Sequence, residues 1–465
     1  MILLAHSNFV ADDPKQQAKM RPYAPLSTLL AAALLRENGH QVALFDATFA
    51  AGVAEFEAML DAARPDIAVV MEDNFNFLTK MCTTVRRDSA LAMIATAKER
   101  GCRVAVNGPD ASDNPALYFA AGADAVVLGE GEIGVLDIVS HWSAGGDSPE
   151  SIEGLVLPDE AGVKRTHPRR ALQDLDGLPL PAWDLVDIES YRSAWTSAHG
   201  EFSWNIATSR GCPYACNWCA KPTFGRRYTV RSAADVAVEM RRLKDEVAPD
   251  HLWFTDDILG LDVAWTCDFA DEVRTNDSVI PFTMQSRVNL MTEKAVEALA
   301  AAGAREVWLG VESGSQKILD AMDKGTTVDA ARTATRTLKA HGIRACWFIQ
   351  LGYPGESWSD LISTRDLIRD EVPDDIGVSV AYPLPGTEFH DRIRAQLGRQ
   401  RNWKDTGDLA MLFQGTYDTA FYRRVRDLLH REAESGEADE LAWLSIENSA
   451  SFHRSPRPFR PAASG

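Results

Sequence analysis

The clearest chemical signal in the chain is the loop Gly211-Cys212-Pro213-Tyr214-Ala215-Cys216-Asn217-Trp218-Cys219. Its three cysteines have C-x3-C-x2-C spacing, and Gly211 and Pro213 interrupt any helix, so the thiolates can gather around one centre. Iron–sulfur clusters are held by cysteine thiolates, and an ordinary electron-transfer cluster uses four. Three thiolates leave one iron open for chemistry, as a catalytic zinc keeps one open position. The alternatives are three structural thiols on a turn and a zinc site that lacks one ligand.

The residues around this loop carry a family resemblance. With Trp218 before the last cysteine, the triad resembles the signature of the radical S-adenosylmethionine (SAM) superfamily. The flanks Thr208-Ser209-Arg210-Gly211 and Pro213-Tyr214 resemble its cobalamin-binding branch, which includes the class B radical SAM methyltransferases and the anaerobic magnesium-protoporphyrin cyclase. The resemblance covers roughly residues 1 to 390. It implies that Cys212, Cys216 and Cys219 bind a [4Fe–4S] cluster, whose fourth iron chelates SAM and whose electron cleaves it to a radical.

Composition limits the class of protein and its compartment. The chain has 465 residues, enough for two or three domains, and its 45% hydrophobic and 25% charged residues are ordinary for a globular protein. A formal net charge of −19 argues against a broad nucleic-acid surface, which needs clustered Lys and Arg. We expect neither a signal peptide at Met1 to Val10 nor a membrane span, because no run approaches ~20 apolar residues. The seven cysteines, an odd number, predict a reducing cytoplasm rather than a disulfide framework.

Residues 1–142 alternate between apolar strands and helices, which predicts an α/β domain of the doubly wound, flavodoxin-like type. Strands are expected at 2–5, 42–45, 67–71, 104–106 and 125–128. A ligand of such a domain lies beyond the carboxyl ends of its strands. The loops at those ends contain nine candidate binding residues: His6, Ser7, Asn8, Asn107, Gly108, Gly129, Glu130, Gly131 and Glu132.

Placed before a radical SAM core, this arrangement resembles the cobalamin-binding domain of that branch, including its Gly-Glu-Gly-Glu turn. The resemblance implies that the nine residues contact cobalamin. The chain departs from the pattern at two places. Thr48 of Asp46-Ala47-Thr48 stands where other cobalamin proteins have an axial histidine, so no histidine ligand to cobalt is expected. Asn107-Gly108-Pro109-Asp110 replaces the Gly-Gly-Pro-His common in relatives.

The rest of the chain divides into four segments. Residues 143–200 are rich in turn formers and are expected to be a linker. Six strand–helix units over 201–390 predict a partial (β/α)6 barrel that is open on one side. Residues 391–448 are expected to be helical, with a core-facing stripe of Phe421, Val425 and Leu429, and 449–465 are expected to be a disordered tail.

The strand ends of this second unit contain groups suited to SAM, in the order typical of the family. Asp256 or Asp257 could accept hydrogen bonds from the SAM ammonium, although the pair is also compatible with a helix N-cap. Ser286 and Arg287 are suited to the SAM carboxylate or ribose. Glu312 is suited to the ribose hydroxyls, and Trp218 to stacking near the adenine.

The resemblance implies a cobalamin-dependent radical SAM enzyme that methylates an unactivated carbon of a small-molecule substrate. An electron donor such as flavodoxin or ferredoxin is its expected partner. The alternative is radical oxidation, cyclisation or rearrangement without methyl transfer. A methylthiotransferase would need a second cysteine triad, which the chain lacks. A non-enzymatic cobalamin sensor would have no use for an open iron.

Overall fold

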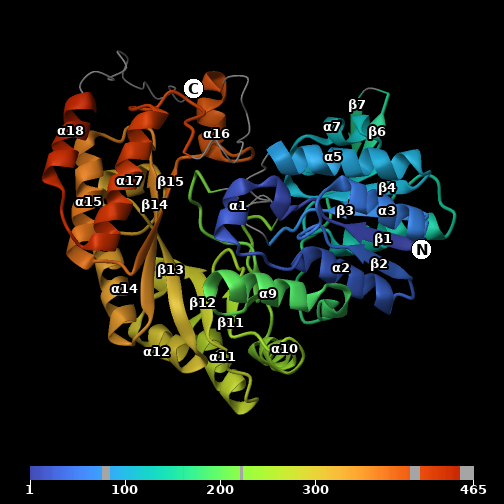
Figure 1. Cartoon of the computed structure of the whole chain (residues 1–465), viewed down its shortest axis with the longest axis horizontal. Coiled ribbons are helices and arrows are strands. Elements are labelled where there is room, and N and C mark those ends of the chain that lie inside the picture. Colours follow the sequence, from blue (N-terminus) through green and yellow to red (C-terminus); the bar gives the residue numbers. More distant parts are fainter. Residues whose placement is uncertain (76–83, 161, 220–223, 398–408, 451–465) are drawn as a thin grey trace.

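The computed structural model of the protein describes residues 1–75, 84–160, 162–219, 224–397 and 409–450. Two large sheets dominate it, one in each half of the chain, and helices flank both (Figure 1). No helix in these ranges combines the length and the apolar composition that are needed to cross a bilayer.

The first sheet has the strand order β2-β1-β3-β4-β5-β6-β7. Its first five members run parallel in the flavodoxin-like order, as expected from their apolar sequences. They are β1 (Ile2–Ala5), β2 (Val42–Phe45), β3 (Ile67–Met71), β4 (Arg103–Asn107) and β5 (Ala125–Val127). Strands β1 and β3 are buried throughout, because helices cover both faces of the sheet.

Side chains alternate between the two faces of this sheet. Ile2 and Leu4 pack with the face that contains α2 and α8, whereas Leu3 and Ala5 pack with the face that contains α3 and α5. The helices of this half are α1 (Pro14–Lys19), α2 (Leu26–Glu37), α3 (Val53–Ala63), α5 (Thr84–Glu99), α6 (Pro109–Asp113), α7 (Pro115–Ala120) and α8 (Glu132–Ser143).

The expected linker, residues 143–200, is largely folded, which corrects the interpretation of this segment. Strands β6 (Leu155–Asp159) and β7 (Gly162–Arg165) are antiparallel and extend the first sheet beyond β5. The apolar start of β6 is buried, because it covers an edge that β5 would otherwise leave unpaired. Helix α9 (Ile188–His199) follows, with Asp187 as its N-cap. The prediction missed these elements because turn-forming residues surround them.

The second sheet has six strands in the order β15-β14-β13-β12-β11-β8, all parallel. They are β8 (Ser203–Ile206), β11 (His251–Phe254), β12 (Phe282–Ser286), β13 (Ala304–Glu312), β14 (Arg344–Leu351) and β15 (Asp375–Val380). Because β8 and β15 do not pair, the sheet stays open, as predicted for this unit. A short antiparallel pair, β9 (Ser209–Arg210) and β10 (Thr229–Val230), flanks the cysteine loop.

Helices connect the parallel strands of the second sheet and cover its outer face (Figure 1). They are α10 (Ala233–Glu246), α11 (Val263–Thr275), α12 (Glu293–Ala302), α13 (Gln316–Ala321), α14 (Val328–Ala340) and α15 (Trp358–Glu371). Helix α16 (Glu388–Ile393) follows β15.

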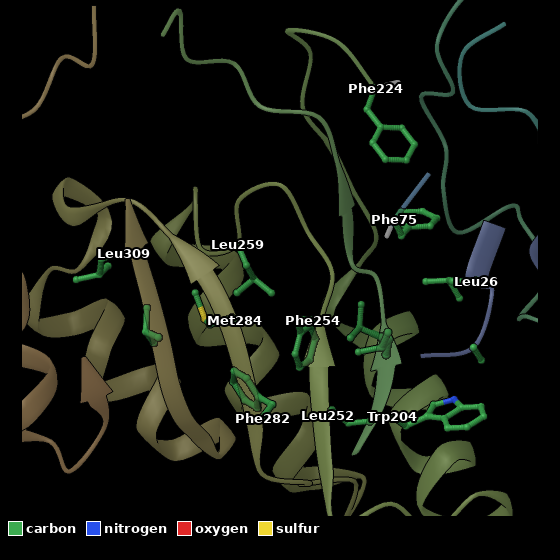
Figure 2. Packing of buried hydrophobic residues seen from close by; sticks show 14 of the residues in the cluster. Leu26, Phe75, Trp204, Phe224, Leu252, Phe254, Leu259, Phe282, Met284 and Leu309 are labelled. Carbon is green, nitrogen blue, oxygen red and sulfur yellow. The ribbon is translucent and has the colours of Figure 1, made fainter. Parts of the chain in front are cut away.

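The two halves share one hydrophobic core. Leu26 and Phe75 of the first half belong to the same buried cluster as Trp204 and Phe224 of the second, and Figure 2 shows them side by side. The Phe75 and Phe224 rings lie 5.1 Å apart between centroids. This shared core therefore fixes the carboxyl ends of the two sheets relative to each other.

The C-terminal region packs against the open end of the second sheet. Helix α17 (Thr419–Ser435) contacts β15 and α15, and its predicted stripe of Phe421, Val425 and Leu429 is buried as expected. Helix α18 (Glu440–Ala450) follows it. The predicted tail, apart from the end of α18, lies outside the described residues.

Candidate active site

The cysteine loop follows β9 at the carboxyl end of the second sheet, which we call the second edge (207–219, 255–260, 286–287, 310–314 and 352–356). Gly211 opens the loop with φ of +80°, and a Cβ there would overlap the Arg227 carbonyl oxygen, so only glycine fits. Cys216 is buried, and Cys212 and Cys219 are half-buried. In the described ranges no three His, Cys, Asp or Glu side chains converge on a single metal ion. The thiolates that hold a cluster bind separate iron atoms.

Asn217 fixes the middle of this loop to the second sheet. Its Nδ2 donates to Ala321 O at 2.9 Å and Asp323 Oδ2 at 2.7 Å, and its Oδ1 accepts the Tyr353 hydroxyl at 2.7 Å. The Tyr353 ring packs 5.3 Å from that of Phe389. On the side of its last cysteine the loop is thus held by hydrogen bonds to a carbonyl, a hydroxyl and the Asp323 carboxylate.

Arg287 places a positive charge against the loop. Its Nη1 lies 3.4 Å from Cys216 Sγ, and its guanidinium lies 3.7 Å from the centre of the Tyr214 ring. The side chain is 5% exposed, and its Nη2 donates to the Lys324 carbonyl. Arg287 thus places a buried positive charge beside Cys216, where it would help to balance the negative charge of thiolate ligands.

Glu312 and Lys324 form a buried ion pair next to the loop. Lys324 Nζ lies 2.7 Å from Glu312 Oε1, and both side chains are less than a tenth exposed. Gly310 lets this ion pair pack closely against its backbone, since a Cβ there would lie only 2.6 Å from Lys324 Nζ. The indole of Trp218 lies 5.9 Å from the same ammonium, and its Nε1 is buried without a hydrogen-bond partner in the described structure. Together with Arg287, these residues provide an anion (Glu312), two cations (Lys324 and Arg287) and an unused hydrogen-bond donor (Trp218 Nε1).

Two other predicted SAM residues are already engaged by the chain itself. Asp256 is buried and accepts Thr208 Oγ1 at 2.7 Å and Ser209 Oγ at 2.5 Å. Burial raises the pKa of this carboxyl, although these hydrogen bonds oppose the rise. Ser286 Oγ donates to Leu259 O at 2.8 Å. Both residues therefore shape the backbone around the loop, whereas Asp257 beside them is half-buried.

The carboxyl end of the first sheet, which we call the first edge (6–8, 46–48, 72–75, 107–110 and 129–132), contains neutral polar groups and carboxyl groups. His6 Nδ1 accepts the Asn8 backbone N–H at 3.2 Å, and its Nε2 lies 2.9 Å from Asp46 Oδ1. Ser7 Oγ donates to Glu72 at 2.5 Å, and burial raises the pKa of that carboxyl. Both ring nitrogens of His6 are thus occupied by the chain.

Asn107 organises the opposite part of the first edge. Its Nδ2 donates to Val127 O at 2.9 Å and Gly129 O at 3.2 Å, and its Oδ1 accepts Asn74 Nδ2 at 3.0 Å. Gly131 has φ of +94°, and a Cβ there would lie 2.5 Å from Asn107 Oδ1. Gly108 packs directly on the Glu72 side chain. These contacts hold the glycine-rich loops in place.

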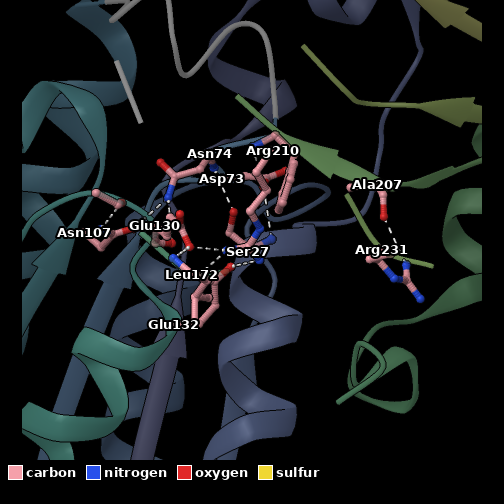
Figure 3. A network of polar contacts seen from close by, with 12 residues as sticks. Ser27, Asp73, Asn74, Asn107, Glu130, Glu132, Leu172, Ala207, Arg210 and Arg231 are labelled. Atoms are coloured by element: carbon pink, nitrogen blue, oxygen red, sulfur yellow. Dashed lines mark hydrogen bonds and ion pairs between the residues drawn. The ribbon is translucent and has the colours of Figure 1, made fainter. Parts of the chain in front are cut away.

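Glu130 and Glu132 point toward the second half of the chain, where they meet Arg210 (Figure 3). The sequence analysis treated them as ligand contacts and treated Arg210 only as part of a motif. Lys324 and Asn217 were also missed as site residues. The sequence did contain a signal for Arg210 and Asn217, because both adjoin the cysteines. Lys324 lies twelve residues after its partner Glu312, and the spacing alone does not reveal the pair.

Comparisons with known proteins agree with this geometry. The profile of the radical SAM superfamily matches residues 206–368. An uncharacterised methyltransferase of Pyrococcus horikoshii is 28% identical over 82% of this chain and 81% of its own length. The hopanoid C-3 methylase of Methylococcus capsulatus is 26% identical over 80% of this chain and 69% of its own length. Across its curated relatives, the chain spans from about half to about four fifths of their length.

A solved structure shares the fold of both halves. The radical SAM methyltransferase TsrM from Kitasatospora setae, with cobalamin and a [4Fe–4S] cluster bound, superposes with a TM-score of 0.70 at 22% identity. The match covers 86% of this chain and 76% of TsrM. The cysteine loop, the parallel second sheet and the matching profile together lead to one assignment. The chain contains a radical SAM domain, which spans residues 206–368.

Proposed function

We propose that this protein is a cobalamin-dependent radical SAM enzyme that methylates a carbon of a small-molecule substrate. The observation that carries the proposal is the convergence of Cys216, Arg287 and the Glu312–Lys324 pair at the second edge. The fold relation to TsrM and the names of the methyltransferase relatives support it. Flavodoxin or ferredoxin is suited to the role of electron donor.

Cys212, Cys216 and Cys219 would hold the cluster, since three thiolates on one loop leave a position open for SAM. Arg287 and Lys324 supply positive charge for the methionine carboxylate. Glu312 accepts hydrogen bonds from the ribose hydroxyls or the ammonium, and Trp218 has an indole face for the adenine. The buried ion pair and the unused Trp218 Nε1 fit such a ligand.

The first edge fits a corrinoid bound without a protein histidine. His6 is occupied on both nitrogens, and no other histidine lies in the described part of this edge. Backbone and small side chains at Ser7, Asn8, Gly108 and Gly129 would contact the ligand, with Asn107 and Gly131 positioning their loops. When bound, the cluster supplies an electron for SAM cleavage and the corrinoid carries a methyl group.

The chain's own residues bind, orient and exclude water. Asn217 and Arg287 fix the loop, Glu312 and Lys324 fix the cosubstrate, and the shared core keeps the two edges facing a common substrate. Such positioning is the protein's share of the catalysis, since the cofactors carry the difficult chemistry.

The test is a product ratio under anaerobic conditions. The reconstituted protein is incubated with SAM, a low-potential reductant and candidate substrates. Methyl transfer predicts S-adenosylhomocysteine and 5′-deoxyadenosine in about equal amounts together with a methylated product, because each marks a separate SAM molecule. 5′-Deoxyadenosine without a methylated product would contradict methyl transfer and favour oxidation or cyclisation.

A further inference from the structure

A buried ion pair joins the two halves directly beside the cysteine loop (Figure 3). Arg210 Nη2 lies 2.9 Å from Glu132 Oε1, and Arg210 Nη1 lies 3.0 Å from Glu130 Oε2 and 3.2 Å from Glu132 Oε2. The Arg210 side chain is 5% exposed and that of Glu132 is fully buried. One guanidinium therefore binds two carboxylates of the first edge, and it sits two residues before Cys212.

Two aromatic rings and a set of hydrogen bonds fix the same guanidinium and its partners. Its carbon lies 5.5 Å from the centres of both Phe75, in the first half, and Phe224, in the second. The Glu130 carbonyl accepts Asn74 Nδ2 at 3.3 Å, and Asn74 in turn is bonded to Asn107. A continuous chain of contacts thus runs from the loops of the first edge to the backbone that leads into the cysteine loop.

We propose that Arg210 is a positioning residue that sets the placement of the cysteine loop relative to the loops of the first edge. A planar guanidinium that binds two carboxylates defines distance and orientation, which a single ammonium does not. The buried pair is costly to desolvate, and the continuous core already joins the halves. The location of this ion pair between the cysteine loop and the loops of the first edge therefore indicates that it aligns the two. The catalytic consequence rests on the proposed function; the structural consequence does not.

The test uses the full-length, reconstituted protein and three variants. Arg210→Met removes the positive charge, and Arg210→Lys keeps the charge but replaces the planar, bidentate guanidinium with an ammonium. Glu132→Gln removes the negative charge of the partner in the first half. Arg369→Met is the matched control, because Arg369 also binds two glutamates, Glu432 and Glu440, far along the chain from the cysteine loop. Amide hydrogen exchange is measured over residues 125–132 and 208–219, and iron content and steady-state kinetics follow.

We expect Arg210→Met and Glu132→Gln to accelerate exchange about tenfold or more in both segments, through local opening. Arg369→Met should leave both segments at the wild-type rate. Iron content should stay at the wild-type level. The kcat for methyl transfer should fall about a hundredfold, since a misplacement of about 1 Å has that cost, with little change in the KM for SAM. Arg210→Lys should lie between wild type and Arg210→Met.

Three results would overturn the proposal. One is exchange that rises only on the side of the substitution, since the two loops would then be independent. Another is loss of iron in Glu132→Gln, which would place the pair in cluster binding. The third is full wild-type behaviour of Arg210→Lys, which would leave charge alone as the requirement. The exchange measurement stands even if no methylated product is ever found, so the two proposals fail separately.

Discussion

The two edges are built from the same parallel-strand architecture but use their polar groups differently. At the first edge, polar side chains bind one another: His6 with Asp46, Ser7 with Glu72, and Asn74 with Asn107. At the second edge they bind the cysteine loop: Asp256 with Ser209, Arg287 with Cys216, and Asn217 with Tyr353. The first edge is held largely by its own side chains, apart from Glu130 and Glu132, which bind Arg210, whereas the second is organised around one inserted segment.

The difference indicates how each edge would meet its ligand. A rim of amides, hydroxyls, carboxyls and glycines that the chain already engages offers shape and backbone contacts, which suit a large ligand with many weak contacts. An edge with buried cations and a buried anion suits a small zwitterion such as SAM, which needs charges in fixed positions. Substitutions should therefore have localised, strong effects at the second edge and graded effects at the first.

The largest effect is expected from the cysteines. Simultaneous replacement of Cys212, Cys216 and Cys219 by alanine should abolish iron and sulfide binding and all 5′-deoxyadenosine formation, because no thiolate remains on the loop. Cys267→Ala is the control, since that half-buried thiol lies on α11. Iron and sulfide analysis after anaerobic reconstitution measures the outcome. A triple variant that kept its cluster would refute the role of the loop.

The next effect concerns the buried ion pair. Lys324→Met leaves the Glu312 carboxylate buried without its cation, which should lower the free energy of unfolding by about 3 kcal/mol. The loss of a charge for the SAM carboxylate should weaken SAM binding about tenfold or more. Lys317→Met, at a pair whose lysine is 59% exposed, should cost less than about 1 kcal/mol. Urea unfolding and calorimetric titration with SAM test both; equal effects of the two variants would argue against the site.

A smaller effect is expected at the first edge. Gly131→Ala places a Cβ 2.5 Å from Asn107 Oδ1 and should displace that amide. Corrinoid retention should fall about tenfold with iron content unchanged, since one of several loops moves. Gly145→Ala is a matched control, because Gly145 has a similar φ of +81° but nothing within 4 Å of an added Cβ. Corrinoid absorbance after gel filtration reports the difference, and equal losses in both variants would mean that backbone strain alone is responsible.

The sequence predicted the elements of the two edges better than their contacts. Apolar runs such as Ile67–Met71 located the parallel strands, because strands covered on both faces are uniformly apolar. The strands β6 and β7 were missed, since turn formers surround them and their pairing depends on the distant edge of β5. The local sequence pattern does not indicate which outer strand of a sheet is free to pair with another strand.

The proximity of site residues was predicted from the family motifs and not where distant segments meet, and the roles of these side chains stay predictions. The cysteines, Arg287 and Glu312 lie together at the second edge as expected, whereas Asp256 and Ser286 turned inward to the backbone. The Glu132–Arg210 pair joins residues that are 78 positions apart. Such pairs depend on how the halves pack, which periodicity and spacing do not encode.

The most specific effect concerns pH and a carboxyl of the second edge that has no ion pair in the described structure. Glu356 is 1% exposed; its Oε2 accepts the Gly352 N–H at 2.7 Å, and its Oε1 has no partner in the described structure. Burial raises the pKa of Glu356 from 4.5 to about 8. The folded state therefore holds a proton that the unfolded chain releases above pH 4.5, so stability falls as pH rises from about 4.5 to about 8 and then levels off.

Glu356→Gln keeps the acceptor for Gly352 and removes the ionisation. The variant should match wild type near pH 5 and become more stable than wild type as pH rises, by up to roughly 4 kcal/mol at pH 8. Glu388→Gln, at a side chain that is 57% exposed, should run parallel to wild type at every pH. Urea unfolding at pH 5, 6.5 and 8 measures the three curves. A stability difference that does not change with pH would mean that Glu356 is ionised in the folded state. The second edge would then contain a buried negative charge without a paired cation.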